Sequence, residues 1–275
     1  MDVTTFIGIA LAITCILVGQ SLEGGQLGSM LQVAAFLIVI GGTFGAVLTQ
    51  FPIPELRRAL REVREVIISR RQPLEPLIAL LVELARRSRR DGLLGLEDEV
   101  VRIPDPFLRQ AIMSLVDGYD AASLRSMLEN MIDYEEECRE PGPQFFEAAG
   151  GYAPTIGILG AVIGLIQVME HLDDPSKLGS GIAVAFVATI YGVASANLVF
   201  LPFAEKLRMK IRTELRRKEM IIEGICSIQE GVHPRTLGKR LEVYTLFDGK
   251  LRKGESRPAR VEVSWSASGE SKKTI

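Results

Sequence analysis

Two threonines, Thr155 and Thr189, have side chains that could take part in chemistry within apolar surroundings. Each lies in a long stretch without ionisable side chains, and nearby Pro154 and Pro202 each leave a backbone carbonyl without its helical N–H donor. Hydroxyl and carbonyl oxygens of this kind can line the path of an ion. A proton relay through a membrane normally needs carboxylates or histidines at depth, and these stretches contain none. If ions pass here, we therefore expect the acidic group to come from a partner protein.

No constellation typical of an enzyme accompanies these threonines. The sequence lacks G-x-S-x-G, G-x-x-x-x-G-K-[ST] and a G-x-G-x-x-G that follows a strand. Its cysteines form no C-x-x-C pair and its histidines are isolated, at solvent or lipid-headgroup positions: Cys15, Cys138, Cys226, His171 and His233. We expect no enzymatic activity, no cofactor, no metal site and no disulfide.

Four stretches without any Asp, Glu, Lys, Arg or His dominate the 275-residue sequence. The mean hydropathy is +0.22 although 24% of the residues are charged, so the charge must be segregated. Each stretch is long enough for a helix of about 20 apolar residues, and none alternates like a strand. The sequence therefore predicts an all-α integral membrane protein with four transmembrane helices, drawn from residues 3–22, 24–54, 148–169 and 178–204.

The first of these stretches could also be a signal peptide. A cleavable signal begins with a basic segment and ends at a small-residue cleavage site before polar sequence. Here Met1 is followed by Asp2, and the stretch runs through Glu23 and Gly24 directly into the second one. We expect an uncleaved helix that pairs with the next helix as a hairpin.

Lysines and arginines give the expected orientation, because basic residues that flank spans stay on the cytoplasmic side. Of the 32 lysines and arginines, fourteen are arginines between Arg57 and Arg139, and seventeen lie between Lys206 and Lys273. Lys177 alone falls in a short connection. Both long polar segments, and with them both termini, are therefore expected in the cytoplasm.

The first polar segment has the pattern of a compact domain of amphipathic helices with Pro and Gly at their ends. Asp120 is an expected N-cap, and the Pro-Gly-Pro sequence that begins at Pro141 is expected to end the last helix. The expected helices cover residues 56–67, 77–84, 93–101, 106–116 and 121–138.

The second polar segment continues the fourth span as a long charged helix, and after about residue 247 it loses all apolar periodicity. The sequence therefore predicts five parts: a transmembrane hairpin at 1–51 with helices at about 3–22 and 29–50, a helical cytoplasmic domain at 52–146, a second transmembrane hairpin at 147–204 with helices at about 148–170 and 178–204, a cytoplasmic helical extension at 205–246, and a disordered tail at 247–275.

Small residues recur on one side of the third and fourth spans. Gly157, Gly160 and Gly164 share a face of the third span, and Gly192 lies on a similar face of the fourth. Small-x-x-x-small faces allow helices to approach closely in a membrane. The pattern fits packing within the chain and an oligomeric interface equally well.

Several stretches of the sequence resemble a known family. The stretch GYAPTIGILGAVIGLI from Gly151, the sequence AFVATIYG from Ala185 and the pair Leu201-Pro202 are similar to the MotA/PomA family of flagellar motor stator subunits, which is distantly related to ExbB and TolQ. The first half agrees in topology. The resemblance covers nearly the whole chain to about residue 245 and leaves out the tail.

The resemblance implies a function and a set of partners. Family members form a homopentamer around a dimer of a MotB-type protein in the bacterial inner membrane. The single transmembrane aspartate of that partner binds the permeating ion, and the ring turns to drive the flagellar rotor. This aspartate would supply the carboxylate that the four stretches lack. No nucleic acid is implied as a partner.

The resemblance also assigns residues to the ion path. Pro154 and Pro202 match the two prolines that the family uses near the path and in coupling, and Thr189 matches its pore-facing threonine, with Thr155 nearby. Sodium-driven members commonly have a threonine or serine where this chain has Ala161. Its absence favours protons, and a sodium-driven stator is the alternative.

A charged segment matches the family's contact with the FliG-type rotor switch protein. Arg89 and Glu97 occupy the matching positions, and Arg90 and Asp98 are expected to assist them. A merely solvated helix face is the competing interpretation, and the retained motif spacing favours rotor contact. Exposed charge pairs contribute little affinity, so we expect them to act in steering and register.

Two further classes of function compete with a motor subunit. An ExbB/TolQ-type energiser of outer-membrane processes typically has three spans with its N-terminus outside, whereas four uncharged stretches are present here. A passive four-helix scaffold would explain neither the two prolines nor Thr189.

Overall fold

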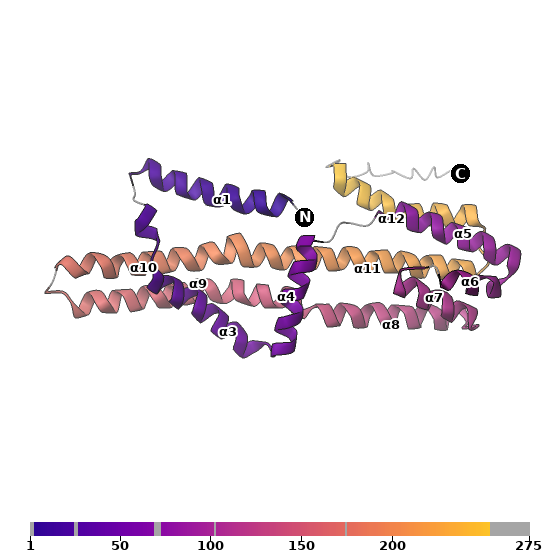
Figure 1. The fold of residues 1–275 in the computed structure, drawn as a ribbon, viewed down its shortest axis with the longest axis horizontal. Coiled ribbons are helices and arrows are strands. Elements are labelled where there is room, and N and C mark those ends of the chain that lie inside the picture. The colour runs from indigo at the N-terminus through magenta and orange to yellow at the C-terminus, as the bar shows by residue number, and fades with distance from the viewer. Residues whose placement is uncertain (1–2, 25–26, 69–72, 102, 174, 254–275) are drawn as a thin grey trace, which may run out of the picture.

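The computed structural model describes residues 3–24, 27–68, 73–101, 103–173 and 175–253. Its regular elements are all helices, and the residues that it describes contain no strand, in agreement with the all-α part of the predicted fold class. The molecule is elongated, with two long helical rods side by side along most of its length (Figure 1). One end of the rods is the second apolar hairpin, and the other end carries a helical domain that we call the distal domain.

The second helix of the N-terminal apolar hairpin begins later than expected. Helix α1 (Val3–Leu22) leads through the 3-10 turn η1 (Leu27–Met30) to a helix built from α2 (Val33–Phe36), the π-helical segment η2 (Leu37–Gly41) and α3 (Gly42–Gln50). This second helix begins at Val33 rather than at residue 29, because Gln32 has extended backbone angles, with φ −122° and ψ 113°. The Tyr191 hydroxyl donates to the Met30 carbonyl at 2.5 Å and so fixes this start to the other hairpin.

The second hairpin forms the two rods. Helix α9 (Pro141–Glu170) turns into α10 (Pro175–Ser195), which continues without a break through the π-helical segment η4 (Ala196–Phe200) into α11 (Leu201–Gln229). The spans were predicted at 148–170 and 178–204, and both helices extend beyond those limits. The domain boundaries predicted near residues 146 and 204 therefore fall inside continuous helices.

Three prolines lie in the first turn or the interior of the long helices. Helix α8 ends at Arg139, as expected from the Pro-Gly-Pro sequence that follows it. Pro141 lies in the first turn of α9, where a proline lacks no intrahelical bond, so the Pro-Gly-Pro sequence starts this helix directly after α8. Pro154 lies inside α9, and Pro202 lies in the first turn of α11, directly after the π-helical segment. A π turn changes the hydrogen-bond register, which allows the rod to pass through Pro202.

The segment between the hairpins consists of helices close to those predicted. They are α4 (Ile53–Ile68), α5 (Glu75–Asp91), the 3-10 turn η3 (Leu93–Leu96), α6 (Glu97–Val100), α7 (Pro106–Val116) and α8 (Ala121–Arg139). The predicted cap is present, since the Asp120 carboxylate accepts from the backbone N–H groups of Ala122 and Ser123 at 3.1 and 3.0 Å. Helix α4 crosses the long helices at the junction between the two halves of the molecule (Figure 1).

The distal domain comprises α5 to α8, the C-terminal half of α11, and α12 (Pro234–Lys253). Its core is a single cluster of buried apolar side chains contributed by these helices, among them Leu81, Leu108, Leu128, Ile221 and Leu237. Helix α12 continues to Lys253, so the tail predicted to be disordered from residue 247 is helical over its first residues. Residues 254–275 lie outside the described residues.

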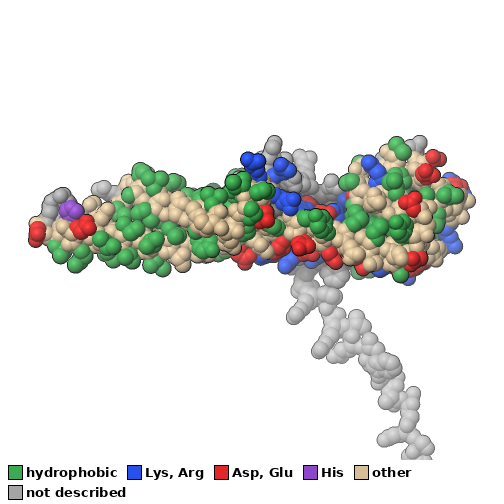
Figure 2. Space-filling model, turned by 90° about the horizontal axis from the view of Figure 1, so that it is seen from below, with side chains coloured by type: hydrophobic (Ala, Val, Ile, Leu, Met, Phe, Trp, Pro, Cys, Tyr) green, Lys and Arg blue, Asp and Glu red, His purple; other side chains and the backbone are tan. Residues whose placement is uncertain are grey.

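Three helices of the described chain are long and apolar enough to cross a membrane, in the segments Val33–Gln50, Ala121–Glu170 and Leu178–Gln229. Helix α1 contributes a shorter apolar stretch, Phe6–Leu22. Figure 2 shows hydrophobic side chains over the hairpin half of the visible face, with acidic and histidine side chains at its extreme tip and charges of both signs over the other half. The predicted segregation of charge is therefore present along the length of the molecule.

Candidate functional site

The contact between α9 and α10 is built from glycines. A Cβ atom added to Gly157 would lie 3.0 Å from the Ala188 carbonyl oxygen, and one added to Gly164 would lie 2.9 Å from the backbone of Ala185. On Gly160 it would lie 2.8 Å from the Ala188 Cβ. Backbone atoms of the two helices thus pack directly against each other, within one chain, along the face of small residues.

The tightest point of this contact is at Pro154. A Cβ on Gly192 would lie 2.5 Å from the Ala153 carbonyl oxygen and 3.2 Å from the Pro154 Cα. Because Pro154 has no N–H group, the Gly150 carbonyl four residues earlier lacks its usual helical donor. The locally weakened part of α9 is therefore pressed against the glycine of α10.

The two threonines lie at about the same level of this helix pair. The Thr189 Cα is 3.5 Å from the position that a Gly157 Cβ would take, and Thr155 is two residues before Gly157. The exposed Thr155 hydroxyl donates to the Tyr152 carbonyl at 2.8 Å, and the half-buried Thr189 hydroxyl donates to the Ala185 carbonyl at 3.2 Å. Each hydroxyl oxygen keeps lone pairs that can face a partner or an ion.

The remaining predicted positions of the apolar half lie on either side of this level. Ala161 is half-buried on α9, and it adds no hydroxyl group to the pair of threonines. Pro202 is exposed beyond η4, several helical turns after Thr189. Among the described residues, no group of three or more His, Cys, Asp or Glu side chains could hold a metal ion.

An aromatic cluster that the sequence analysis missed holds the junction between the two halves. The Phe145 and Phe146 rings are 5.1 Å apart, edge to face, and Phe51 and Phe203 lie 6.0 and 6.1 Å from them. Phe200, at the end of η4, is buried in the same cluster. The spacing of these phenylalanines at the ends of the uncharged stretches is the signal that could have revealed the cluster.

The predicted rotor-facing charges lie at one corner of the distal domain, far from the hairpin turn (Figure 1). Arg89 and Arg90 are exposed in the last turn of α5, and Glu97 and Asp98 are exposed in α6. Gly92, with φ 78°, makes the turn between the two helices. The turn brings the two pairs of charges onto the same corner.

The charges at this corner are not equivalent. The Arg90 guanidinium donates two hydrogen bonds to Asp91, at 2.9 and 2.8 Å, which lowers the pKa of Asp91 below its ordinary value. Among the described residues, Arg89, Glu97 and Asp98 have no ion-pair partner within 4.0 Å. Arg87, which sequence reasoning did not single out, donates to Glu99 at 2.5 Å and ties α5 to α6 from the inner side.

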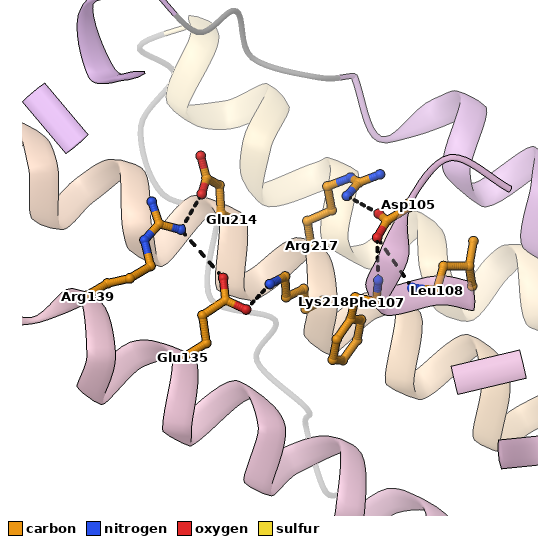
Figure 3. A network of polar contacts seen from close by, with 8 residues as sticks. All are labelled: Asp105, Phe107, Leu108, Glu135, Arg139, Glu214, Arg217 and Lys218. Atoms are coloured by element: carbon orange, nitrogen blue, oxygen red, sulfur yellow. Dashed lines mark hydrogen bonds and ion pairs between the residues drawn. The ribbon is translucent and has the colours of Figure 1, made fainter. Parts of the chain in front are cut away.

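A network of ion pairs connects this corner to the rods (Figure 3). Asp105 uses one carboxylate oxygen to cap α7, accepting from Phe107 and Leu108 N–H groups at 3.0 and 3.3 Å. Its other oxygen accepts from Arg217 of α11 at 2.5 Å. One largely buried carboxylate therefore fixes the segment after α6 to the rod.

The same network joins α8 to α11. Arg139 of α8 pairs with Glu214 of α11 at 2.5 Å and with Glu135 at 3.6 Å, and Glu135 also pairs with Lys218. The Lys218 ammonium lies 5.3 Å from the centre of the Phe107 ring. Sequence reasoning missed the ion pairs between α8 and α11 because the paired residues are 75 or more positions apart.

Comparison with known proteins gives the class of this fold. A family model described as the MotA/TolQ/ExbB proton channel family matches residues 99–220, and one described as Motility protein A N-terminal matches residues 6–92. Motility protein A of Bacillus subtilis is 36% identical over 261 residues, which cover 94% of this chain and 97% of that protein.

Solved structures agree with the sequence matches. The flagellar MotAB stator complex from Bacillus subtilis has a chain that aligns with a TM-score of 0.83 at 36% identity, covering 92% of this chain and 100% of that one. The C. jejuni MotAB structure aligns with a TM-score of 0.84 at 34% identity, covering 89% and 96%.

The helical rods and their apolar hairpin are thus those of a membrane protein of the proton-channel class, which is not a class of enzymes. Within that class the chain belongs to the Motility protein A family. The resemblance inferred from the residues after Gly151 is confirmed, and the match from residue 6 onward extends it to the first hairpin.

Proposed function

We propose that this chain is a stator subunit of the bacterial flagellar motor that couples the passage of protons to rotation of the rotor. The observation that carries the proposal is the continuity of one helix, from the α10 contact with Pro154, through η4, to the distal domain. A change of packing at the hairpin can therefore be transmitted to the exposed charges at the far corner.

In the proposed topology, all four apolar helices span the inner membrane and both termini are cytoplasmic. Helix α1 is the first of these spans in chain order, and exposed apolar side chains along it, such as Phe6, Leu11 and Val18, would face lipid or a neighbouring subunit. The distal domain, rich in arginine and glutamate, then lies in the cytoplasm. The distribution of basic residues supports this orientation.

The ion-binding carboxylate belongs to a partner in this proposal. The spans of this chain contain no carboxylate or histidine, and the similar structures of known function are MotAB complexes. We therefore infer a MotB-type single-span partner with a transmembrane aspartate, a dimer of which is surrounded by a homopentamer of this chain.

Residues at the level of Pro154 line the path beside that aspartate. Thr155 and Thr189 offer hydroxyl oxygens to the ion or its water, and Pro154 and Pro202 allow α9 and the α10–α11 rod to change shape. Ala161 supplies no oxygen ligand, which favours protons over sodium. An ion crossing with the membrane potential releases roughly 2.3 kcal/mol per 100 mV, enough to bias one conformational step.

The far corner is the proposed contact with a FliG-type rotor switch protein. Arg89 and Glu97 would make the principal contacts, with Arg90 and Asp98 beside them. Because Arg90 is already engaged by Asp91, Arg89 is the arginine available to an outside carboxylate at this corner.

The test is restoration of swimming in a host that lacks its own stator genes. The chain is expressed with a MotB-type partner protein, and we expect swimming that persists when sodium is removed from the medium. Pro154→Ala should abolish swimming at normal membrane abundance, whereas Pro104→Ala, at an exposed position of the distal domain, should not. Absence of any swimming with the unchanged chain would overturn the proposal, and swimming that stops without sodium would replace protons by sodium.

A further inference from the structure

Two apolar side chains flank the acidic pair at the far corner. Leu94 is 73% exposed and Val101 is 85% exposed, and both belong to the short helical segment formed by η3 and α6 and the residue that follows it. No other large apolar side chain described between residues 53 and 253 is as exposed as either of them. We call Leu94, Glu97, Asp98 and Val101 the tip ridge.

The tip ridge occupies one face of a helical segment. Its members are spaced i, i+3, i+4 and i+7, which brings side chains of a helix onto a common side. The intervening Leu96 and Val100 are buried at 0% and 8% exposure in the core of the distal domain. The ridge therefore points outward because its opposite face is anchored.

A second contact fixes the orientation of the ridge. The Arg87–Glu99 pair, at 2.5 Å, joins α6 to α5 on the inner side, and its side chains are only 35% and 17% exposed. The ridge is thus a preorganised surface, which reduces the ordering cost of binding a partner.

The apolar members can supply the affinity that the charges cannot. An exposed ion pair contributes about 0–1 kcal/mol, whereas full burial of a leucine or valine side chain contributes about 1.5–3 kcal/mol. A single exposed leucine needs no explanation. Two apolar residues on either side of two carboxylates, on one rigid face, form a pattern that matches helix-to-helix recognition.

We propose that the tip ridge docks onto an amphipathic helix of the rotor switch protein, which presents a basic side chain to Glu97 and Asp98 and apolar side chains to Leu94 and Val101. The proposal rests on the proposed function and deepens it. Charge complementarity favours an occupant with a basic side chain, because the carboxylates have no described ion-pair partner and, with Arg90 engaged by Asp91, they outnumber the one free arginine, Arg89. The rotor switch protein is the partner that the proposed function gives to this corner. The arginine then sets the register of the contact.

Serine substitutions in the full chain, co-expressed with its partner in swimming cells, test the ridge. Leu94→Ser and Val101→Ser should each reduce the torque per stator unit several-fold, while the uptake of protons by vesicles that contain the complex stays within twofold. Leu94→Met should retain most of the torque. The matched controls are Met113→Ser and Val243→Ser, at apolar positions of the same domain that are 46% and 48% exposed.

A photocrosslinking amino acid at position 94 or 101 identifies the occupant. We expect an adduct with the rotor switch protein that disappears in cells lacking that protein. Unchanged torque in both serine variants, an equal loss in the controls, or adducts only with a second copy of this chain would each overturn the proposal. If the unchanged chain drives swimming and the ridge variants keep its full torque, only the ridge assignment fails. If the unchanged chain drives none, the proposed function itself fails.

Discussion

Outside its apolar core, the distal domain joins its helices by means opposite to those of the α9–α10 hairpin. In the hairpin, glycines remove side chains so that two backbones touch, with gaps too small for one added carbon atom. In the distal domain, long charged side chains reach across helices and pair, as Arg139 does with Glu214 and Arg217 with Asp105. The first contact depends on shape and tolerates no added atom, whereas the second depends on charge and should weaken by degrees.

The largest expected effect comes from adding one methyl group to the hairpin. Gly192→Ala places a Cβ 2.5 Å from the Ala153 carbonyl oxygen, so one of the backbones must shift. Overpacking of this kind costs about 1–3 kcal/mol, and here it lies at the proposed ion path. We expect loss of swimming and a lower melting temperature of the complex in detergent.

The matched control for this substitution lies in the same helix. A Cβ on Gly179 would meet nothing within 4 Å, so Gly179→Ala should preserve swimming and the melting temperature. Equal damage from both variants would mean that the close approach at Gly192 is not what the hairpin requires.

An intermediate effect is expected in the distal domain. Arg217→Gln leaves the Asp105 carboxylate, 14% exposed, without its charged partner, and should lower the free energy of unfolding by about 1–3 kcal/mol. The measurement is thermal melting of the purified complex, followed by circular dichroism. Arg216→Gln changes the exposed neighbour, which has no partner among the described residues, and should shift the melting temperature little. If the Arg217→Gln variant were as stable as the unchanged chain, the Asp105–Arg217 pair would not be part of the connection.

The smallest effect concerns Cys226, which is buried on α11 in the distal core. Burial raises the pKa of this thiol above its ordinary value of 9.0, so the thiolate that reacts with maleimide is scarcer than for a free cysteine at every pH. In a Cys15→Ala background at about pH 7.5, we expect the half-buried Cys138 to react at least about tenfold faster than Cys226. Denaturation should remove the difference, and equal rates in the folded protein would show that water reaches this core.

Local signals made much of the fold predictable. Asp120 caps α8 because its carboxylate can reach the next free N–H groups, a property of the residue and its neighbours alone. Helix α7 likewise begins at Pro106 and ends at Val116, as expected from its pattern of apolar residues. The charge-free stretches gave the apolar hairpins for the same reason, since the requirement to satisfy backbone hydrogen bonds acts within each stretch.

The end of α8 was also predictable, because it falls at Arg139, directly before the Pro-Gly-Pro sequence that was expected to end it. The sequence did not show that Pro141 also starts the next helix, α9, where its missing N–H breaks no intrahelical bond. Helix α12 extends to Lys253, beyond the limit expected from the loss of apolar periodicity, and its first turns dock on the distal core through Leu237 and Leu241.

Contacts between distant residues could not be found from one sequence. Asp105 and Arg217 are 112 positions apart, and each sits in a segment with many other charges, so no pattern selects the pair. The exposure of Leu94 and Val101 was equally hidden, because the same residue types at the same spacing are buried elsewhere in the domain. The candidate ion-path residues, by contrast, came from motif positions, and their roles remain predictions.

The single helix from Pro175 to Gln229 also has a mechanical consequence. Beyond η4, α11 has 29 residues and is therefore about 43 Å long, at a rise of about 1.5 Å per residue. A tilt of about 10° at the π-helical segment would sweep its far end sideways by roughly 7 Å, more than the pitch of about 5.4 Å of a helix. In the proposed function the junction would be the fulcrum of a lever arm, whose stiffness sets how much of a small displacement in the membrane arrives at the corner.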